Sequence, residues 1–431
     1  MARWLFKGAR VVDPEAGHDG VADVLVEDSL LVEVGSGLSA GAKTEVVDCD
    51  GLVLAPGLVD LHTHLREPGR EDSETVETGS RAAALGGFTA VCAMPNTDPV
   101  ADHLAVVMEV LARGDKAGLC QVLPAAAITK GLEGEQLVEM GELAAAGVRL
   151  FTDDHRGVQS SRVLRLALEY AKAFDVVVCQ HPQDEALSEG AHMHEGHYSA
   201  LLGVRGAPAE AESTMVARDI ALARLTGGRL HVTHVSTAES ARWLREGIAR
   251  DVRVTADATP HHLSLIDAEV EYDTNRKMNP PLRTAEDRDA LRAAVAEGVI
   301  GTIATDHAPH AVEDKEVEFD LARFGTTGLE TALGVVLTDL VEPGVLSLDA
   351  AVRAMSTTPA GILGLTDHGS LQAGTAANLV VFDPAAEWVV GERPFASKGR
   401  NSAFLGRALR GRVVHTMLAG DLTVRDGEAT R

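Results

Sequence analysis

The sequence has few cysteines and no long apolar run. Its four cysteines lie far apart within apolar segments and form no C-x-x-C pair, so neither a disulfide framework nor a thiolate metal site is expected. No signal peptide precedes the first strand-like segment, and no apolar run reaches the ~18 residues of a membrane-spanning helix. These absences predict a soluble cytoplasmic protein whose cysteines, Cys49, Cys92, Cys120 and Cys179, are buried reduced thiols.

Basic residues are also scarce. The chain has 39 Lys and Arg against 64 Asp and Glu, a formal net charge of -25, and no Lys/Arg-rich tract. A nucleic-acid partner is therefore not expected. An anionic small-molecule substrate remains compatible with this charge, because salt screens distant charges over ~8 Å and leaves the local field of a metal site dominant.

Strand-like segments occupy both ends of the chain. Residues 1–54 and 366–431 contain short β-branched or alternating runs separated by Gly, Asp and Pro, with C-terminal turns predicted at Asp383-Pro384, Gly420-Asp421 and Asp426-Gly427. Neither half has an obvious core alone. We predict that the two halves join into one small β-sandwich module.

Between these halves, over residues 55–365, apolar strand-like runs alternate with Ala-, Leu- and Glu-rich helical segments, as in parallel sheets with helical crossovers. Eight strand-like runs predict a (β/α)8 barrel. They are Leu58-Leu65, Phe88-Met94, Cys120-Ile128, Val148-Thr152, Val176-Gln180, Arg229-His234, Val252-Ala256 and Gly301-Thr305.

A His-x-His pair ends the first run. In a strand, His62 and His64 point to the same face and could hold one metal ion, and Arg66 on that face offers a planar cation suited to a carboxylate. Such a pair by itself is often just two partly exposed histidines. The metal hypothesis therefore depends on the residues at the ends of the other runs.

Polar side chains follow several of those runs. Because barrel enzymes build their sites at the C-terminal ends of the strands, we expect these residues to converge. Four histidines and two carboxylates exceed one tetrahedral site, which favours two ions sharing a ligand, with zinc preferred and manganese or cobalt as alternatives. The residues are Asn96, Asp153, Asp154, His181, His234, Asp306, His307 and His310.

This set of residues is typical of amide hydrolysis. Bound divalent ions activate water and polarise a carbonyl group. Asp306 could take a proton from the water and pass it to the leaving nitrogen. Arg66, Asn96 and His310 would then hold an anionic substrate.

The motifs together resemble type I bacterial dihydroorotases of the amidohydrolase superfamily, from about residue 5 to the C-terminal module. The combination is specific, although His-x-His alone is not. The matching stretches are Asp60-Leu61-His62-Thr63-His64-Leu65-Arg66-Glu67-Pro68-Gly69, Met94-Pro95-Asn96-Thr97, Phe151-Thr152-Asp153-Asp154, Lys277-Met278-Asn279-Pro280-Pro281-Leu282-Arg283 and Thr305-Asp306-His307-Ala308-Pro309-His310.

The resemblance implies zinc-dependent, reversible cyclisation of N-carbamoyl-L-aspartate to L-dihydroorotate in pyrimidine synthesis, with a hydroxide between the metals as nucleophile. It implies a homo-oligomer and a possible association with aspartate transcarbamoylase. By position in the motifs, His62 and His64 would bind one zinc, His181 and His234 the other, Asp154 would bridge them, and Asp306 would be both a ligand and the general acid/base. The substrate would contact Arg66, Asn96, Asn279 and His310, with backbone at Phe324-Gly325 closing over the ring.

Several neighbouring polar residues have a structural interpretation. Only one of Asp153 and Asp154 can face the barrel axis, and the family pattern favours Asp154. Lys130 is the single lysine expected near the mouth, where some relatives place a carboxylated bridging lysine. We interpret His231 and the pair His261-His262 as packed or hydrogen-bonded, and His192, His194 and His197 as a solvated loop.

Two positions depart from the family pattern: His155, where glycine is usual, and Pro182, where cysteine is common. The charged segment 311–322 predicts either a mobile lid or an ordinary solvated loop.

Allantoinase and dihydropyrimidinase are rival activities, and a non-catalytic partner of aspartate transcarbamoylase is a third possibility. Arg66 favours a substrate with a carboxylate, and the complete ligand set favours catalysis.

Overall fold

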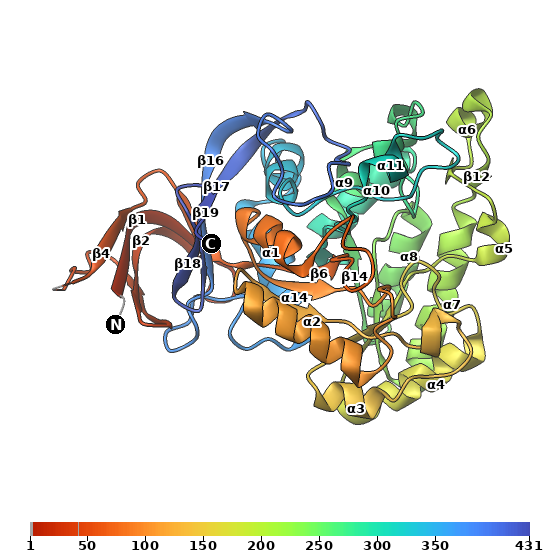
Figure 1. Ribbon diagram of the computed structural model, residues 1–431, viewed down its shortest axis with the longest axis horizontal. Helices are drawn as coiled ribbons and strands as arrows, with labels where there is room; N and C mark the ends of the chain where they lie inside the picture. Colours follow the sequence, from red (N-terminus) through yellow and green to blue (C-terminus); the bar gives the residue numbers. More distant parts are fainter. Residues whose placement is uncertain (1–2, 42) are drawn as a thin grey trace.

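Eight parallel strands form the centre of the molecule in the computed structural model, which describes residues 3–41 and 43–431 (Figure 1). They make two hydrogen-bonded groups, in the orders β6-β7-β8 and β15-β14-β13-β10-β9. All eight lie within or beside the predicted runs. Their bounds are β6 Leu58–Thr63, β7 Phe88–Ala93, β8 Gln121–Pro124, β9 Leu150–Thr152, β10 Val177–Gln180, β13 Arg229–Val232, β14 Val254–Ala258 and β15 Thr302–Ile303.

Two single parallel bridges join these groups into a ring. Ala126 pairs with Phe151 between the continuation of β8 and β9, and Thr63 pairs with His307 between β6 and the segment after β15. The eighth strand is short because the backbone N–H of Thr305 donates to the side chain of Asp60 at 2.9 Å instead of continuing the ladder. The predicted barrel architecture is therefore confirmed.

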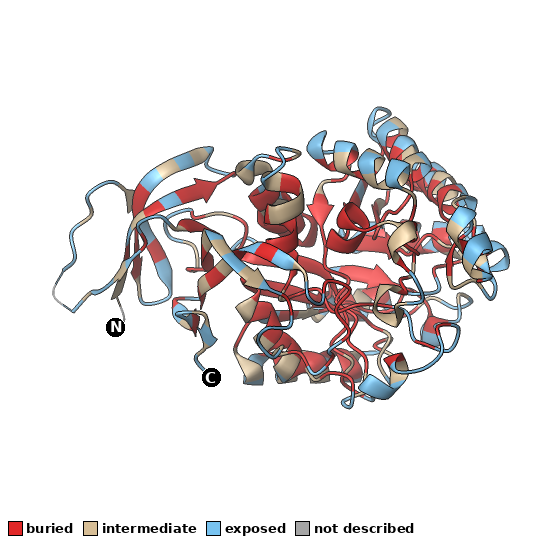
Figure 2. Ribbon diagram, turned by 90° about the horizontal axis from the view of Figure 1, so that it is seen from above, coloured by how far each residue is buried: buried red, intermediate tan, exposed pale blue. Residues whose placement is uncertain are grey.

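Helices cover the outside of the ring, and Figure 2 shows buried residues concentrated in the strands with exposed residues on the outer helix faces. In α4 (Ser161–Ala171), Leu164, Ala167, Leu168 and Ala171 recur at helical spacing and are buried, and Ser160 caps the first turn. The other crossover helices are α1 Val76–Leu85, α2 Leu104–Ala117, α3 Met140–Ala145, α7 Glu210–Thr226, α8 Ala238–Ile248, α10 Ala285–Ala296 and α12 Ala332–Val336.

Several short elements lie outside the main strands and helices of the barrel. Most of them lie in the loops that follow strands β10, β14 and β15, and the last two precede the return of the chain to the terminal sheet. They are α5 Glu185–Ser188, β11 Met193–His194, α6 His197–Leu202, β12 Gly206–Ala207, α9 Pro260–Ser264, α11 Val312–Lys315, α13 Leu348–Val352 and α14 Thr358–Leu363. None of the helices in the described part of the chain is both long and apolar enough to cross a membrane.

Both ends of the chain contribute to a single nine-stranded sheet, as predicted for the β-module. Its order is β19-β18-β17-β16-β5-β1-β2-β3, with β4 paired to β1, so β5 is the strand that joins the two halves. Buried side chains from both halves, such as Val11, Val24 and Val381, form its separate apolar core. The bounds are β1 Arg3–Asp13, β2 His18–Glu27, β3 Leu30–Gly35, β4 Glu45–Asp48, β5 Val53–Pro56, β16 Leu379–Val389, β17 Ala408–Leu418, β18 Asp421–Arg425 and β19 Glu428–Ala429.

One predicted turn in this module is wrong. Asp383 and Pro384 do not end a strand but lie inside β16, where the pairing with β17 shifts register between Asp383 and Glu387. A proline lacks the N–H that a regular ladder needs, and a bulge accommodates it without ending the strand. The turns at Gly420-Asp421 and Asp426-Gly427 do separate β17, β18 and β19.

Candidate metal centre

The predicted site residues gather in one cavity of ≈ 390 Å³ at the C-terminal ends of the barrel strands. His62 lies just behind the wall, buried against two of the carboxylates that line it. The predicted residues in the wall are His64, Arg66, Asn96, Asp154, His181, His234, Asn279, Asp306, His310, Phe324 and Gly325. Residues from segments that are distant in sequence therefore share one cavity.

The first histidine pair faces two carboxylates. His62 Nε2 lies 3.3 Å from Asp154 Oδ1 and 3.6 Å from Asp306 Oδ1. His64 Nε2 lies 3.5 Å from Asp154 Oδ2 and 3.4 Å from Asp306 Oδ1. The expectation that both rings point to the same side of the first strand agrees with this geometry.

The second pair, His181 and His234, also lies near Asp154. His181 Nδ1 and His234 Nε2 lie 2.8 Å apart, and His234 Nε2 is 4.0 Å from Asp154 Oδ1. Two buried three-residue groups result, each with its ligand atoms within 4.8 Å of one another. Asp154 belongs to both groups, which is the position of a shared ligand.

Hydrogen bonds on the far sides of three rings set their tautomers. His64 Nδ1 donates to Asn96 Oδ1 at 3.0 Å, and His181 Nε2 donates to Gln183 Oε1 at 2.7 Å. His62 Nδ1 lies 2.9 Å from Thr233 Oγ1, whose own proton goes to Asp257, so the hydroxyl accepts from His62. The inward nitrogen of each ring is therefore the one available to a cation. Without a cation, Asp154 and Asp306 outweigh burial and raise the pKa of His62 to about 10, so His62 also carries a proton on that nitrogen at neutral pH.

This arrangement of ring nitrogens fits bound cations. The inward nitrogens of three imidazoles converge on a carboxylate within a buried site, and His62 Nε2 has no hydrogen-bond partner among the described residues. Such an atom is costly to bury unless something binds it. Imidazole and carboxylate donors, each held by an outer hydrogen bond, are the usual ligands of divalent transition metals.

Two buried aspartates outside the predicted set hold the ligands in place. Asp257 accepts hydrogen bonds from the backbone N–H of His234 at 2.6 Å and from His231 Nε2 at 2.8 Å. Asp60 accepts from the backbone N–H of His62 at 3.3 Å and from that of Thr305. Their positions, at the end of the seventh run and two residues before His62, are the signals that could have identified them.

These contacts also confirm two structural interpretations. His231 is hydrogen-bonded away from the metal centre, and Asp153 accepts from the backbone N–H groups of Ile128 and Thr129 at 2.8 and 2.9 Å. Asp153 thus ties the third strand to the fourth. Asp154 is left as the carboxylate that faces the cavity.

Asp306 has a left-handed backbone conformation, with φ 48, at the end of the eighth strand. The next residue, His307, points away from the cavity: its Nδ1 accepts from the backbone N–H of Gly328 at 3.1 Å, and its Nε2 lies 3.4 Å from Glu74 Oε2. Burial alone would raise the pKa of Asp306, but His64 and His62 outweigh it and hold that pKa below its usual range. Asp306 is therefore an ionised carboxylate beside the first histidine pair.

A cationic side chain lies next to this centre. Arg66 Nε donates to the carbonyl of Pro309 at 3.1 Å, while its terminal nitrogens have no partner in the part of the chain that the structure describes. Burial lowers the pKa of Arg66 to about 10, so the side chain stays charged at neutral pH. The free end of the fork is available to an anion.

Some of the remaining residues predicted to contact the substrate already form hydrogen bonds with other protein groups. Asn96 Nδ2 donates to Asp154 at 3.3 Å, whereas Asn279 Nδ2 lies 3.4 Å from His181 Nε2, which is itself a donor, so the two do not bond. His310 Nε2 donates to the carbonyl of Phe324 at 2.7 Å. Besides facing the cavity, Asn96 thus helps to orient His64.

Two buried lysines anchor the predicted lid, which contains α11. Lys315 Nζ donates to the carbonyls of Arg323 and Gly325 at 2.7 and 3.0 Å. Lys277 Nζ donates to those of Phe319 and Asp320 at 2.7 and 3.0 Å. The segment is therefore tied to the barrel at several points, and its mobility stays a prediction.

The interpretation of the histidine-rich loop is wrong in part. His194 is buried in the short strand β11 and lies 3.1 Å from Arg283 Nη1, and only His197 is exposed. The reason is long-range: Arg283 also donates to Ala207 and brings β12 against β11. Lys130 is exposed and does not line the cavity, so it is not a bridging ligand.

The other histidine interpretations agree with the structure. His261 and His262 are buried, and His262 is hydrogen-bonded to Thr259 and to the carbonyl of Pro280. His155, which replaces the usual glycine, has φ 68, a conformation that glycine adopts readily. His155 therefore has the backbone conformation expected of a glycine at this position, next to Asp154.

Comparisons with known proteins agree with this geometry. Residues 51–240 match a family model described as dihydro-orotase-like. The chain is 50% identical to a dihydroorotase of Streptomyces coelicolor (strain ATCC BAA-471 / A3(2) / M145) over 434 residues, covering 100% of both chains. It is 49% identical to a dihydroorotase of Anaeromyxobacter dehalogenans (strain 2CP-C) over 428 residues, or 99% of this chain and 98% of that one.

Solved structures show the same fold. An L-hydantoinase (dihydropyrimidinase) from Arthrobacter aurescens superposes with a TM-score of 0.89 at 25% identity, covering 100% of this chain and 98% of the other. A dihydropyrimidinase from Brevibacillus agri NCHU1002 gives a TM-score of 0.84 at 24% identity, with 99% and 96% covered. Both likenesses extend over the barrel and the terminal sheet.

Proposed function

The chain belongs to the dihydroorotase family, and from this membership we propose that it catalyses the reversible cyclisation of N-carbamoyl-L-aspartate to L-dihydroorotate. It is a hydrolase that acts on cyclic amides. The observation that carries the proposal is the position of Arg66, an unpaired cation beside two groups of metal-ligand type. Such a neighbour suits a cyclic amide that also bears a carboxylate.

We propose two zinc ions per chain. His62, His64, Asp154 and Asp306 would hold one, and His181, His234 and Asp154 the other. When bound, zinc polarises the amide carbonyl and lowers the pKa of a water ligand to about 7. The outer hydrogen bonds of His62, His64 and His181 support this assignment, because each leaves the inward ring nitrogen available to a cation.

Asp306 is the proposed general acid/base. Its Oδ1 lies within 3.6 Å of both histidines of the first pair, so the carboxylate is ionised and ready to accept a proton from the attacking water. As the ring C–N bond breaks, the same oxygen returns that proton to the leaving nitrogen. Ring closure uses the same steps in reverse.

Arg66 would bind the substrate carboxylate through the free end of its guanidinium group. Asn279, His310 and the backbone at Phe324-Gly325 line the same cavity and would surround the ring. Asn96 would contact the substrate while holding His64. Plain dihydrouracil has no carboxylate for Arg66, and this difference separates the proposed substrate from that of a dihydropyrimidinase.

Replacing Arg66 tests that contact. Arg66→Lys keeps the charge but loses the fork that can make two parallel hydrogen bonds, so we expect KM for dihydroorotate to rise by about tenfold with a smaller change in kcat. The measurement is steady-state kinetics of both proteins. Arg323→Lys, an exposed arginine at the rim of the same cavity, is the matched control and should leave KM nearly unchanged. An unchanged KM in Arg66→Lys would place the substrate carboxylate elsewhere.

The function itself is tested by assaying the purified protein alone. We expect hydrolysis of dihydroorotate, followed by ultraviolet absorbance, to exceed that of dihydrouracil or allantoin, with close to two zinc ions per chain in the same sample. Faster turnover of either alternative would replace the proposed activity. Inactivity with metal bound would instead favour a subunit that needs aspartate transcarbamoylase.

Three further expectations belong to this proposal. Residues 1–54 and 366–431 would form one module beside a barrel of residues 55–365, and the β5 pairing with β1 and β16 supports that division. A role in pyrimidine synthesis implies a cytoplasmic location. Homo-oligomerisation, and association with aspartate transcarbamoylase, would be tested by measuring the mass of the protein in solution with and without the transcarbamoylase.

A further inference from the structure

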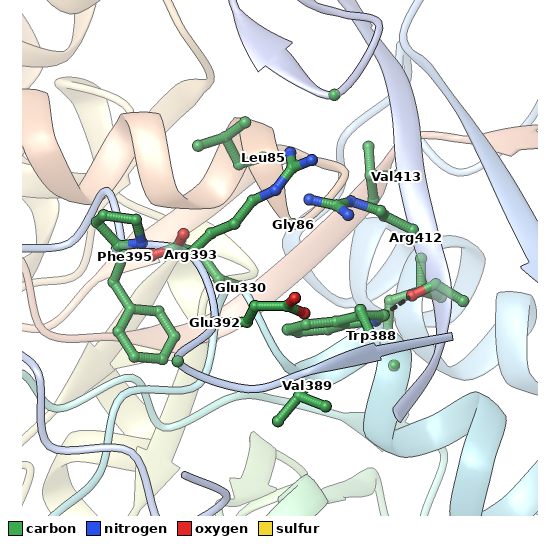
Figure 3. A pocket seen from close by; sticks show the side chains of 16 residues that line it. Leu85, Gly86, Glu330, Trp388, Val389, Glu392, Arg393, Phe395, Arg412 and Val413 are labelled. Atoms are coloured by element: carbon green, nitrogen blue, oxygen red, sulfur yellow. Dashed lines mark hydrogen bonds between the residues drawn. The ribbon is translucent and has the colours of Figure 1, made fainter. Parts of the chain in front are cut away.

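A second cavity, of ≈ 160 Å³, lies between the barrel and the terminal sheet, on α12, β16 and β17 (Figure 3). None of the residues that line it lines the metal-centre cavity. A cavity needs only ~10–15 Å³ to hold one water molecule, so this one has room for a much larger ligand.

Two arginines of this cavity have no partner. Arg393 is exposed on the loop after β16 and Arg412 is half-buried on β17, and neither makes an ion pair or side-chain hydrogen bond within the described residues. Both extend toward the same part of the cavity in Figure 3. Burial and the charge of Arg393 lower the pKa of Arg412. The two cations are therefore close enough to feel each other's charge.

Arg412 differs from the other arginines in the strands of the terminal sheet of this chain. The chain has a formal net charge of -25, and other arginines of the same sheet find acidic partners. Arg410, two residues before Arg412 on the same strand, pairs with Glu342 at 3.1 Å and with Glu387 at 2.9 Å. The guanidinium group of Arg412 therefore faces the cavity without a hydrogen-bond partner among the described residues, although the chain has many acidic groups.

An aromatic ring forms another wall. The indole of Trp388 packs on α12, where a Cβ added to Gly334 would lie 3.2 Å from its Cζ2 atom. Its Nε1 donates to the carbonyl of Gly411 at 2.9 Å, which fixes the ring plane. Figure 3 shows this ring and the two guanidinium groups bordering the same space.

Two acids, Glu330 and Glu392, also line this cavity, and neither pairs directly with the arginines within the described residues. Glu330 accepts hydrogen bonds from the backbone N–H groups of Ala396 and Ser397 at 3.0 and 3.2 Å. Burial raises the pKa of Glu330 to about 7, so part of its population is neutral at neutral pH. Glu392 is exposed, and its charge acts on Arg412 from a distance, raising the pKa of Arg412 against the effects of burial and Arg393.

We propose that this cavity binds a phosphate monoester carried on a planar ring, the class to which nucleoside monophosphates belong. The phosphate would lie at the rim between Arg393 and Arg412, where guanidinium groups can make paired hydrogen bonds to its oxygens. The ring would stack against Trp388. The site is separate from the metal centre and takes a ligand that the metal centre does not require.

Isothermal titration calorimetry with uridine 5′-monophosphate on the zinc-loaded protein tests the site. We expect binding to weaken by about tenfold, or ~1.4 kcal/mol, in each of Arg393→Gln and Arg412→Gln. Arg410→Gln removes a paired arginine from the same strand and should bind like the unmodified protein. Melting temperatures of the three variants show whether each is folded.

Several results would overturn the proposal. They are a dissociation constant above ~1 mM for the unmodified protein, equal weakening in all three variants, or inorganic phosphate binding as tightly as the nucleotide. The last result would remove the role of Trp388. Because binding is measured without turnover, the outcome is independent of whether dihydroorotate is the substrate.

Discussion

Asp306→Asn is expected to lower kcat for dihydroorotate hydrolysis by ~100-fold or more while KM changes little. An amide cannot take up the proton of the attacking water, and the loss of a positioned acid/base costs ~2.7 kcal/mol or more of transition-state stabilisation. The cavity keeps its shape, because asparagine has nearly the same volume and the φ of 48 at this position suits Asn as well as Asp. Steady-state kinetics in both directions, ring opening and ring closure, measure the effect.

Metal content separates the two roles of Asp306. As a ligand beside His62 and His64 it contributes to the first ion, so zinc per chain must be determined on the same sample. Asp320→Asn, an exposed aspartate of the adjacent loop, is the matched control and should be fully active. A normal kcat with normal zinc content would exclude Asp306 as the proton carrier, whereas lost zinc would assign its effect to metal binding.

Removal of metal is expected to abolish activity and to lower the melting temperature. In the metal-free protein His62 Nε2 stays buried without a hydrogen-bond partner among the described residues. Each ion that binds only the folded state stabilises it by ~2.7 kcal/mol when free metal is 100 times its dissociation constant. Chelation followed by thermal melting and activity assays measures both effects.

Restoration identifies the metal. Zinc should restore activity and melting temperature together, and manganese or cobalt in part, because imidazole suits transition metals. Magnesium prefers oxygen ligands and is the negative control. A metal-free sample that keeps full activity would contradict the proposed centre, and one that recovers stability but not activity would limit the metal to a structural role.

Much of the site was predictable because its signals are local. Alternation along a strand places His62 and His64 on one face, and the position of Asp154, His181, His234 and Asp306 after apolar runs places them at one end of a barrel. These arguments need only chain periodicity and the rule that parallel strands end at the same edge. The structure brings all six residues together.

The predictions that failed depend on contacts between distant segments. The burial of His194 results from Arg283, 89 positions away, and the bulge at Pro384 results from its pairing with β17. The tautomer of His62 depends on Thr233, which lies 171 positions away, and on Asp257 behind it. No local pattern contains these pairings.

The barrel, the terminal sheet and the residues that face the metal centre are therefore encoded locally, since periodicity and strand-end position are written in consecutive residues. Tertiary contacts decide which ring nitrogen each histidine turns toward the metal centre. They also leave the terminal guanidinium nitrogens of Arg66 available beside that centre. Tertiary contacts also leave Arg393 and Arg412 without partners beside Trp388. The physical reason is that hydrogen bonds, ion pairs and cavities are set by which segments meet in space.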